Sequence, residues 1–566
     1  MSGTGKSAVV RELAARGYRA VDTDDPALGL TEPREHGEWG WRADRVQALL
    51  SRETAAVLFV AGCAEEQVQF YPQFDHVILL SAPAAVVVER LETRTTNPYG
   101  KDPEERRRVL GYIETVEPLL RNSADLEVDT TGSIDSVVET IIGFVDLHAP
   151  RSLSPRRSTG RPGALRPGAR RTEMISHSML HSPEAHETLT EHSWDRDLAL
   201  AAIRGIAADC EASFGASSPL RWPMHPRDVE DDDGPYTTVY LGSAGVIYAL
   251  ELLARRGLVD GIRNYVPALE QAVEAYRALP EFEEWAHPPS LWMGETGILL
   301  TLHRLAPSAE VAGRIAELVA ANADDPHREF MWGSPGTMLA ARGIENPELW
   351  DESAARLLDA WEESGLWTQD LYGGRVRYLG PAHGFAGCVA ALAHAPDDEL
   401  HRRASEDFKR HAIEEDGLAN WPPLADVGLV GRDGAIRLQW CHGAPGMVAC
   451  LARIAPGDDE HERLLIAGGE LTWRAGPLAK GANLCHGTAG NGLAFLKLFE
   501  RTGDELWLDR ARAFAMHAVA QVERERAGVG RGRYSLWTGD PGTALYLALC
   551  IEGSSSLPGF DDNDFV

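Results

Sequence analysis

Residues 491–523 read NGLAFLKLFERTGDELWLDRARAFAMHAVAQVE. The opening part is apolar nearly all round, which is typical of a helix that is buried on every side. A Thr-Gly turn follows, and the remaining residues place apolar and charged side chains on opposite faces at helical spacing. The stretch therefore predicts a hairpin made of a buried inner helix and an amphipathic outer helix.

The same plan recurs through the second half of the chain. Each unit opens with a G-x-x-G motif, and the seven motifs begin at Gly242, Gly294, Gly333, Gly384, Gly443, Gly487 and Gly539. Seven inner helices are then connected by six outer helices, and residues 199–214 supply a seventh outer helix. The count predicts an all-α domain that closes into an α/α toroid of about seven helical hairpins. The glycines are expected to let loop backbones crowd together at one mouth of the ring.

An open solenoid is the alternative to a closed ring. It would need polar caps at both ends, and the last helix, residues 543–551, is too apolar to serve as one. The sequence therefore favours closure.

The first half, residues 1–148, reads as an α/β domain. Residues 8–17 predict a helix that ends at Gly17. Residues 18–25, 55–62 and 76–83 predict strands, and the last two are short apolar runs typical of buried parallel strands. This alternation is βαβ organisation.

The chain opens with MSGTGKS, in which Gly3, Gly5, Lys6 and Ser7 look like the end of a phosphate-binding loop, G-x-x-x-x-G-K-[ST]. The first glycine of that motif would precede Met1, and the strand that should feed the loop is missing. The sequence therefore predicts a truncated P-loop domain. We expect either that its true start lies upstream or that this half is a truncated relic, and both an active and an inactive kinase stay open.

Between the two halves lies a segment rich in Arg, Pro and Gly, RSLSPRRSTGRPGALRPGARRT at residues 151–172. Such a composition cannot bury a core, so residues 149–190 are expected to be a disordered linker, with a basic arm for an acidic partner as the alternative. The second domain then covers residues 191–566.

Composition excludes some classes of protein. A net charge of −30 over 566 residues argues against a nucleic-acid binder, which needs a basic face. No apolar run is long enough to span a membrane, and no signal segment is seen at the N-terminus, so a cytoplasmic location is expected. Seven cysteines form an odd, sparse set that favours metal binding or catalysis over a disulfide framework.

Three of the seven motifs differ from the others: YLGPAHGFAG (378–387), RLQWCHGAPG (437–446) and KGANLCHGTAGNG (480–492). They place His383, Cys441, Cys485 and His486 at the starts of inner helices, on one mouth of the ring. Two cysteines and one histidine suit Zn²⁺, and three protein ligands leave a fourth position open, which is the catalytic pattern. His442 is a further candidate ligand.

These motifs resemble the lanthionine synthetase C-like family over about residues 190–566. The resemblance implies an α/α toroid with zinc on Cys441, Cys485 and His486. It implies an enzyme that adds a thiol to dehydroalanine or dehydrobutyrine in a peptide or protein, giving a thioether. His383 matches the catalytic histidine and would move the proton. Further matches are an arginine that would stabilise the enolate, Arg437, and an acidic position, Glu329.

The resemblance also bears on which thiol is used. His442 stands where bacterial peptide cyclases often have Tyr, as in stand-alone members that join glutathione to dehydroamino acids. Lys480 matches a lysine that those members use for the glutathione carboxylate, and Arg533 or Arg531 could play a similar part. Glutathione or an equivalent small thiol is therefore an expected partner. An intermolecular adduct and ring closure in a lanthipeptide both stay open.

The first half resembles P-loop kinases of the shikimate and nucleotide kinase group. The resemblance implies ATP and Mg²⁺ as cofactors, with Lys6 at the phosphates and Ser7 at the metal. Asp22 would assist Mg²⁺, and Asp24 would hold an acceptor hydroxyl. Residues 90–101, which include Arg90 and Arg94, look like the lid.

Three other functions compete with thiol addition. A glycosidase needs two carboxylates facing the cavity, whereas Glu295 and Asp540 are isolated. A zinc prenyltransferase also activates a thiol, usually as a two-subunit enzyme. The third alternative is a non-catalytic module that holds glutathione or a peptide.

Overall fold

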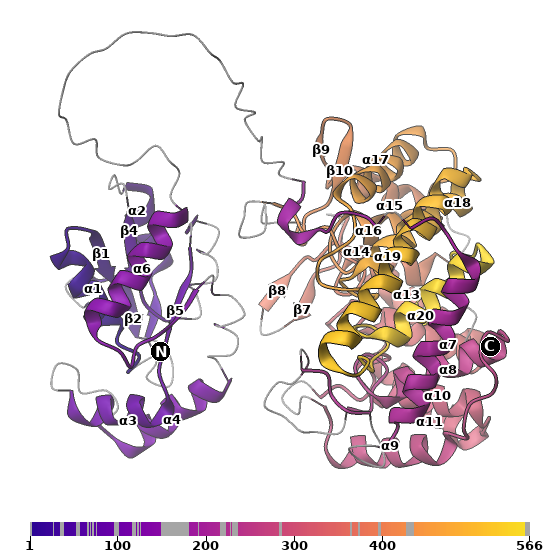
Figure 1. Ribbon diagram of the computed structural model, residues 1–566, viewed down its shortest axis with the longest axis horizontal. Helices are drawn as coiled ribbons and strands as arrows, with labels where there is room; N and C mark the ends of the chain where they lie inside the picture. Colours follow the sequence, from indigo (N-terminus) through magenta and orange to yellow (C-terminus); the bar gives the residue numbers. More distant parts are fainter. Residues whose placement is uncertain are drawn as a thin grey trace, which may run out of the picture. The chain divides into compact units, whose positions relative to one another are not determined.

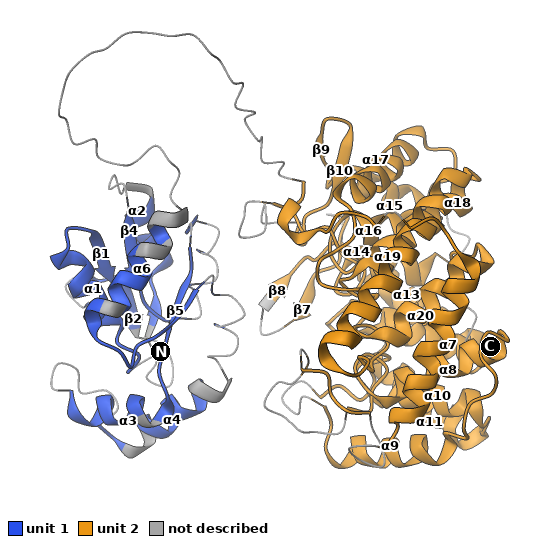
Figure 2. Ribbon diagram, in the orientation of Figure 1, with its two compact units in different colours: residues 1–174 blue, residues 175–566 orange. Residues whose placement is uncertain are grey.

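The computed structural model divides the chain into two compact units, residues 1–174 and 175–566 (Figure 2). It describes residues 3–25, 28–33, 39–52, 57–64, 67, 70, 73–74, 76–94, 101–115, 120, 124, 126–148, 180–190, 192–215, 222–226, 228, 236–281, 286–362, 365–371, 374–393, 398–425, 435–557 and 559–560. The predicted linker segment 149–179 lies outside the described residues.

The first unit is a small α/β region. Among its described residues, parallel strands pair as β1 (Arg19–Asp22) with β4 (Leu58–Ala61) and as β5 (Ile78–Ser81) with β6 (Leu126–Asp129). The described residues of this unit also form the antiparallel pair β2 and β3 and five helices: β2 Thr31–Pro33, β3 Trp39–Trp41, α1 Lys6–Ala15, α2 Ala43–Arg52, α3 Ala84–Thr93, α4 Pro103–Thr115 and α6 Ile134–His148. The predicted α/β class, strands and first helix are confirmed.

The predicted phosphate-binding loop runs directly into helix α1. Gly3 and Gly5 have φ angles of 88° and 92°, a left-handed conformation that costs glycine little. Gly5 caps α1, so that Lys6 and Ser7 are the first residues of the helix. The loop therefore presents backbone N–H groups at a helix start, as an anion-binding loop requires.

Residues 180–190 belong to the second unit, although they fall within the predicted linker, residues 149–190. Leu180 is buried, and its carbonyl oxygen accepts a hydrogen bond from Asn420 Nδ2 at 2.6 Å. His186 forms a β-bridge with Leu478, next to a short 3₁₀ helix at Pro183–Ala185. Composition alone misses this because one buried leucine and a few backbone hydrogen bonds anchor an otherwise polar segment.

The second unit is built from inner and outer helices that alternate along the chain (Figure 1). The seven inner helices are α8 Ser243–Arg255, α10 Glu295–Leu305, α12 Ser334–Gly343, α14 Phe385–Leu392, α16 Ala444–Leu451, α18 Thr488–Thr502 and α20 Asp540–Glu552. The outer helices are α7 Arg196–Ser213, α9 Val266–Ala278, α11 Ala309–Asn322, α13 Pro347–Asp359, α15 Asp398–Arg410, α17 Asp459–Ala475 and α19 Glu505–Val529. Two short hairpins interrupt the pattern: β7 Gln369–Leu371 with β8 Gly374–Val376, and β9 Ile413–Glu415 with β10 Leu418–Asn420.

Closure of the ring follows from which helices touch. Each inner helix packs on the next one along the chain, and α20 packs back on α8. The first outer helix, α7, lies against α19 and α20, the last elements of the chain. The predicted α/α toroid of seven hairpins is therefore confirmed, and the first glycine of every G-x-x-G motif is the N-cap of an inner helix.

The second glycine of each motif is needed for close packing. A Cβ atom on Gly490 would lie 1.8 Å from the carbonyl oxygen of Leu484, and one on Gly446 would lie 1.9 Å from that of Trp440. The loop that leads into each inner helix therefore folds back against the first turn of that helix. This contact holds Cys441 and Cys485, which lie within those two loops, beside the helix starts.

We expect Gly490→Ala to destabilise the second unit by about 3 kcal/mol or more, because the obstructing atom belongs to the backbone and cannot rotate away. Gly205→Ala in α7 is the matched control: its Cβ would meet nothing within 4 Å. That substitution should stabilise by about 0.4–1 kcal/mol. Chemical unfolding of both variants checks the difference, and equal stabilities would contradict the close approach at Gly490.

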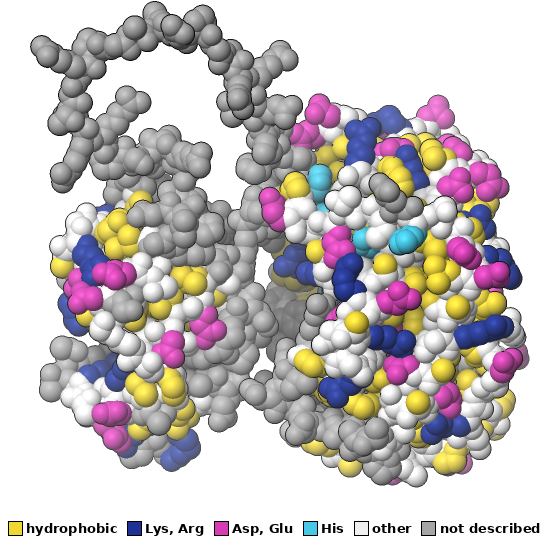
Figure 3. Space-filling view, in the orientation of Figure 1, with side chains coloured by type: hydrophobic (Ala, Val, Ile, Leu, Met, Phe, Trp, Pro, Cys, Tyr) yellow, Lys and Arg dark blue, Asp and Glu magenta, His cyan; other side chains and the backbone are white. Residues whose placement is uncertain are grey.

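The face of the second unit seen in Figure 3 carries interspersed acidic and basic side chains. Ion pairs such as Arg463–Glu414 and Arg402–Glu399 join neighbouring charges on its surface. Within the described ranges, every helix is too short or too polar to cross a bilayer.

Candidate active site

Three neighbouring inner helices, α14, α16 and α18, position the candidate chemistry. Each is capped by a glycine, and a histidine directly precedes that glycine in all three: His383, His442 and His486. Cys441 and Cys485 come two residues before their glycines. Because inner helices that begin at the same mouth lie side by side, identical register brings these side chains to one place.

The two cysteines meet. The Cys441 N–H donates to the carbonyl oxygen of Cys485 at 3.1 Å, and the Cys485 thiol donates to the Cys441 sulfur. Gln439 Nε2 lies 3.0 Å from Cys441 Sγ, and the Tyr240 hydroxyl lies 3.0 Å from Cys485 Sγ. Both cysteines are buried. The thiol pair is thus surrounded by hydrogen-bond donors that favour a negative sulfur.

These contacts shift the pKa values of the two thiols in opposite directions. The hydrogen bond from Cys485, followed by that from Gln439 and the charges of His383 and Arg437, lowers the Cys441 pKa to about 7 against the cost of burial. Donation of its hydrogen to Cys441, together with burial, raises the Cys485 pKa. One thiolate in the pair is therefore accessible near neutral pH, which is the state that a metal ligand or nucleophile needs.

His486 completes the predicted ligand set in sequence, but it does not touch both thiols. Among the described residues, Cys441, Cys485 and His486 do not bring three donor atoms within 4.8 Å of one another. The ring lies near the charges of Lys480, Arg533 and Asp228, and burial, followed by the two positive charges, lowers its pKa to about 4. His486 is therefore neutral at physiological pH, as a metal ligand must be.

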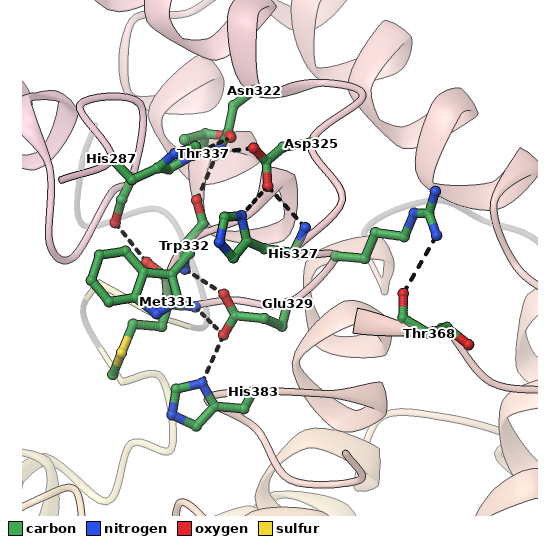
Figure 4. Close-up of polar contacts among 12 residues, drawn as sticks. His287, Asn322, Asp325, His327, Glu329, Met331, Trp332, Thr337, Thr368 and His383 are labelled. Carbon is green, nitrogen blue, oxygen red and sulfur yellow. Dashed lines mark hydrogen bonds and ion pairs between the residues drawn. The ribbon is translucent and has the colours of Figure 1, made fainter. Parts of the chain in front are cut away.

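His383 is held by a buried carboxylate. Its Nδ1 lies 3.0 Å from Oε2 of Glu329, and Glu329 is fully buried in the loop between α11 and α12 (Figure 4). The backbone N–H groups of Met331 and Trp332 donate to the same carboxylate. This arrangement fixes the orientation of the His383 ring through its Nδ1. The ring of His442 stacks at 6.2 Å from that of His383.

The charges of three predicted basic residues act on the cysteines or on His486. Arg437 is exposed, and its charge acts on the thiol of Cys441, whereas the charge of Lys480 acts on Cys485 and His486. Arg533 is paired with the carboxylate of Asp228 through two of its nitrogens, with Nε at 2.7 Å. A thiol substrate that used Arg533 would have to compete with that carboxylate.

Sequence reasoning missed two neighbours of the thiols, Tyr240 and Gln439. Register could have found Tyr240, because it stands two residues before Gly242, the place that cysteines occupy before Gly443 and Gly487. Gln439 lies two residues before Cys441 and carries no comparable signal.

In the first unit, Arg90 lies beside the glycine loop. Its guanidinium donates to Thr130 at 2.9 Å and to the carbonyl oxygen of Gly3 at 3.4 Å. Asp22 ends β1 and accepts from the Asp24 N–H at 3.1 Å, and the charge of Lys6 acts on Asp24. Arg94 caps the end of α3. Half of the predicted lid, residues 95–100, lies outside the described residues.

Comparison with known proteins gives relatives for both units. Residues 236–562 match the lanthionine synthetase C-like protein family, and residues 1–111 match an AAA domain. A LanC-like protein of Arabidopsis thaliana, GCL1, is 30% identical over 33% of this chain and 44% of its own length. The zebrafish (Danio rerio) glutathione S-transferase LANCL1 is 30% identical over 32% of this chain and 46% of its own length. The chain thus spans just under half the length of these two relatives.

Shikimate kinase 2 of Serratia proteamaculans is 30% identical over 26% of this chain and 91% of its own length. Among solved structures, nisin cyclase aligns with a TM-score of 0.41 and 16% identity, over 56% of this chain and 89% of its own. The chain belongs to the lanthionine synthetase C-like family and carries an N-terminal P-loop kinase-like unit related to shikimate kinase.

Proposed function

We propose that the second unit catalyses addition of a small thiol to dehydroalanine or dehydrobutyrine residues of a peptide or protein, and that the reaction depends on zinc. The observation that carries the proposal is the meeting of Cys441 and Cys485 beside a histidine that a buried carboxylate holds. Family membership supports it, because it places these motifs in a lanthionine synthetase C-like protein.

The chemistry of the donor set suits a zinc ion, although the His486 ring would have to move closer to the two sulfurs to complete the ligand set. Cys441 and Cys485 are adjacent soft donors, hydrogen-bond donors already favour a negative sulfur, and His486 is neutral. These three residues would hold the metal and leave a position open for the substrate thiol. A zinc ion bound there supplies the positive charge that converts a thiol into a thiolate near neutral pH.

The chain's own residues would handle the rest of the reaction. The thiolate sulfur forms a bond to the β-carbon of the dehydroamino acid, and the electron pair of the C=C bond moves to give an enolate. Arg437 would stabilise the enolate oxygen, and His383 would deliver a proton to the α-carbon from Nε2. Glu329 would hold the imidazole in place through Nδ1 and support the imidazolium. The proton lost by the thiol balances the one delivered.

The proposed thiol is an anionic one of the glutathione kind, so that the adduct forms between molecules. Two observations favour this choice over ring closure. The charge of Lys480 lies beside Cys485, and a relative is named as a glutathione S-transferase. A lanthipeptide cyclase remains the second candidate, and its substrate would carry the thiol and the alkene on one chain.

Replacing Lys480 with alanine should raise the KM for glutathione about 10–150-fold, because a charge-assisted contact with a carboxylate is worth about 1.5–3 kcal/mol. 2-Mercaptoethanol, which has no carboxylate, is the matched substrate, and its KM should stay constant. Lys480→Arg keeps the charge and should retain most of the affinity. Steady-state kinetics with both thiols measures the two KM values. An equal change in KM for both thiols would show that Lys480 does not recognise the carboxylate.

The alternative, a non-catalytic binding module, predicts a different result for adduct formation. Loss of His383 would leave thiol and peptide binding intact in both accounts, but only an enzyme would lose adduct formation. Mass spectrometry of a dehydroalanine peptide incubated with glutathione and each protein separates the two.

For the first unit we propose phosphate binding at Gly3–Ser7, with ATP and Mg²⁺ as ligands. The left-handed glycines before α1 and the guanidinium of Arg90 beside the loop support it. Lys6 would contact the phosphates, and Ser7 and Asp22 would serve the metal. Asp24 would hold the acceptor hydroxyl, and Arg94 would belong to the lid.

A further inference from the structure

Three side chains from two neighbouring loops converge close to Glu329 (Figure 4). His287 lies in the loop that leads to α10, and Asp325 and His327 lie in the loop between α11 and α12. One donor atom from each of the three lies within 4.8 Å of the other two. None of these residues belongs to a G-x-x-G motif, so the repeat does not explain why they meet.

The carboxylate of Asp325 lies between the two imidazoles. Its Oδ1 is hydrogen-bonded to Nδ1 of His327, and its Oδ2 lies 3.5 Å from Nε2 of His287. The ring centroids of the two histidines are 5.1 Å apart. The side chains of Asp325, His287 and His327 are 13%, 19% and 28% exposed, so the cluster is sheltered but open to ions from solvent.

Asn322, at the end of α11, adds a fourth possible metal ligand through its amide oxygen. Its Nδ2 donates to the carbonyl oxygen of Trp332 at 3.1 Å and to Thr337 Oγ1 at 3.3 Å, and these bonds fix which end of the amide is oxygen. The amide oxygen therefore points at His287 Nε2, 2.8 Å away. Two imidazole nitrogens, a carboxylate and an amide oxygen thus face one small volume.

We propose that His287, Asp325 and His327, with the amide oxygen of Asn322, form a second metal site that takes Zn²⁺ or a similar divalent transition-metal ion. Imidazole and carboxylate together are a donor set for such ions, whereas Ca²⁺ and Mg²⁺ prefer oxygen donors alone. The site is separate from the thiol pair and has no sulfur ligand. It does not depend on the proposed thiol chemistry.

The position of the site suggests what it does. Asp325 and His327 stand on the loop that also carries Glu329, the residue that holds His383. An ion bound by both of them and by His287 would tie that loop to the loop before α10. The ion would thereby fix the position of the Glu329 carboxylate, which is bonded to His383, as contacts around an active site orient its catalytic groups.

Counting bound metal in the full-length chain tests the site. The protein is stripped with a chelator, loaded with Zn²⁺, passed through a desalting column and measured by elemental analysis. We expect about two zinc ions in the wild type, about one in His287→Ala and in His327→Gln, and about two in His401→Ala. His401, on the outer helix α15, controls for the loss of any histidine. Circular dichroism verifies that each variant is folded. If one of the histidine variants does not fold, Asp325→Asn takes its place.

Cobalt separates this site from the cysteines. Co²⁺ bound to thiolates gives a sulfur-to-cobalt charge-transfer band, which a nitrogen–oxygen site lacks. The band should persist in His327→Gln and disappear in Cys485→Ala, while Cys485→Ala still binds about one cobalt ion. Wild-type metal content in folded His287→Ala and His327→Gln would overturn the inference and leave a hydrogen-bonded His–Asp–His cluster. Retention of all zinc in Cys485→Ala, with loss in the histidine variants, would instead overturn the zinc ligands of the proposed function and keep this site.

Discussion

Replacing Cys485 with alanine should abolish thiol addition, with a fall in rate of about 10³-fold or more. A free thiol with a pKa of about 8.5 is only a few per cent ionised at neutral pH, so losing its activation alone costs a factor of about 30. Loss of the position that holds the thiol near the alkene adds at least a comparable factor. The rate of adduct formation on a dehydroalanine peptide, followed by mass spectrometry, measures the effect.

The same variant should lose about one equivalent of zinc. Cys450→Ala is the matched control, because Cys450 is also a buried cysteine of this unit but lies inside helix α16, away from the thiol pair. That control should keep both its metal content and its activity. A folded Cys485→Ala protein with wild-type rate would show that the thiol pair is structural, and the reaction would have to be sought elsewhere.

His383→Ala should lower kcat by about 10²–10⁴-fold, the usual contribution of a positioned acid or base. The zinc content should be unchanged, because His383 is bonded to Glu329 and is not a proposed ligand. A variant that binds metal, thiol and peptide yet forms no adduct would place His383 in proton delivery. Activity that survives in a folded His383→Ala protein would assign that step to another group.

Glu329→Gln tests the carboxylate behind His383 separately. The substituted amide keeps one acceptor oxygen in place of two, so it cannot accept from His383, Met331 and Trp332 together. We expect kcat to fall about 10–100-fold with little change in KM, as for other outer contacts that orient a catalytic group. The double variant with His383→Ala should be no worse than His383→Ala alone. Additive losses would mean that Glu329 acts independently of the histidine.

Much of the architecture was predictable because it repeats. Each G-x-x-G motif marks a helix start, and identical register in the copies that end at Gly446 and Gly490 puts Cys441 and Cys485 together. The need for glycine there is local, since a Cβ would strike a carbonyl oxygen only six residues away. Local rules of this kind can be read from one sequence.

Some contacts could not be predicted from the sequence, because they join residues that are distant along the chain and do not occupy matching positions of the repeat. The ion pair of Arg533 with Asp228 spans 305 residues, and His383 meets Glu329 across 54. The resemblance pointed to Glu329, but only the folded chain shows its carboxylate bonded to the ring. The converging loops that carry His287, Asp325 and His327 are likewise a product of tertiary packing.

The central claim is that the thiol pair and its neighbours join a thiol to a dehydroamino acid. The most direct measurement is the mass of a dehydroalanine peptide after incubation with glutathione and the zinc-loaded chain, beside parallel reactions with Cys485→Ala and with no protein. If the thiol pair catalyses the addition, a product heavier by one glutathione forms much faster with the wild type than in either control. Equal rates in all three reactions would contradict it.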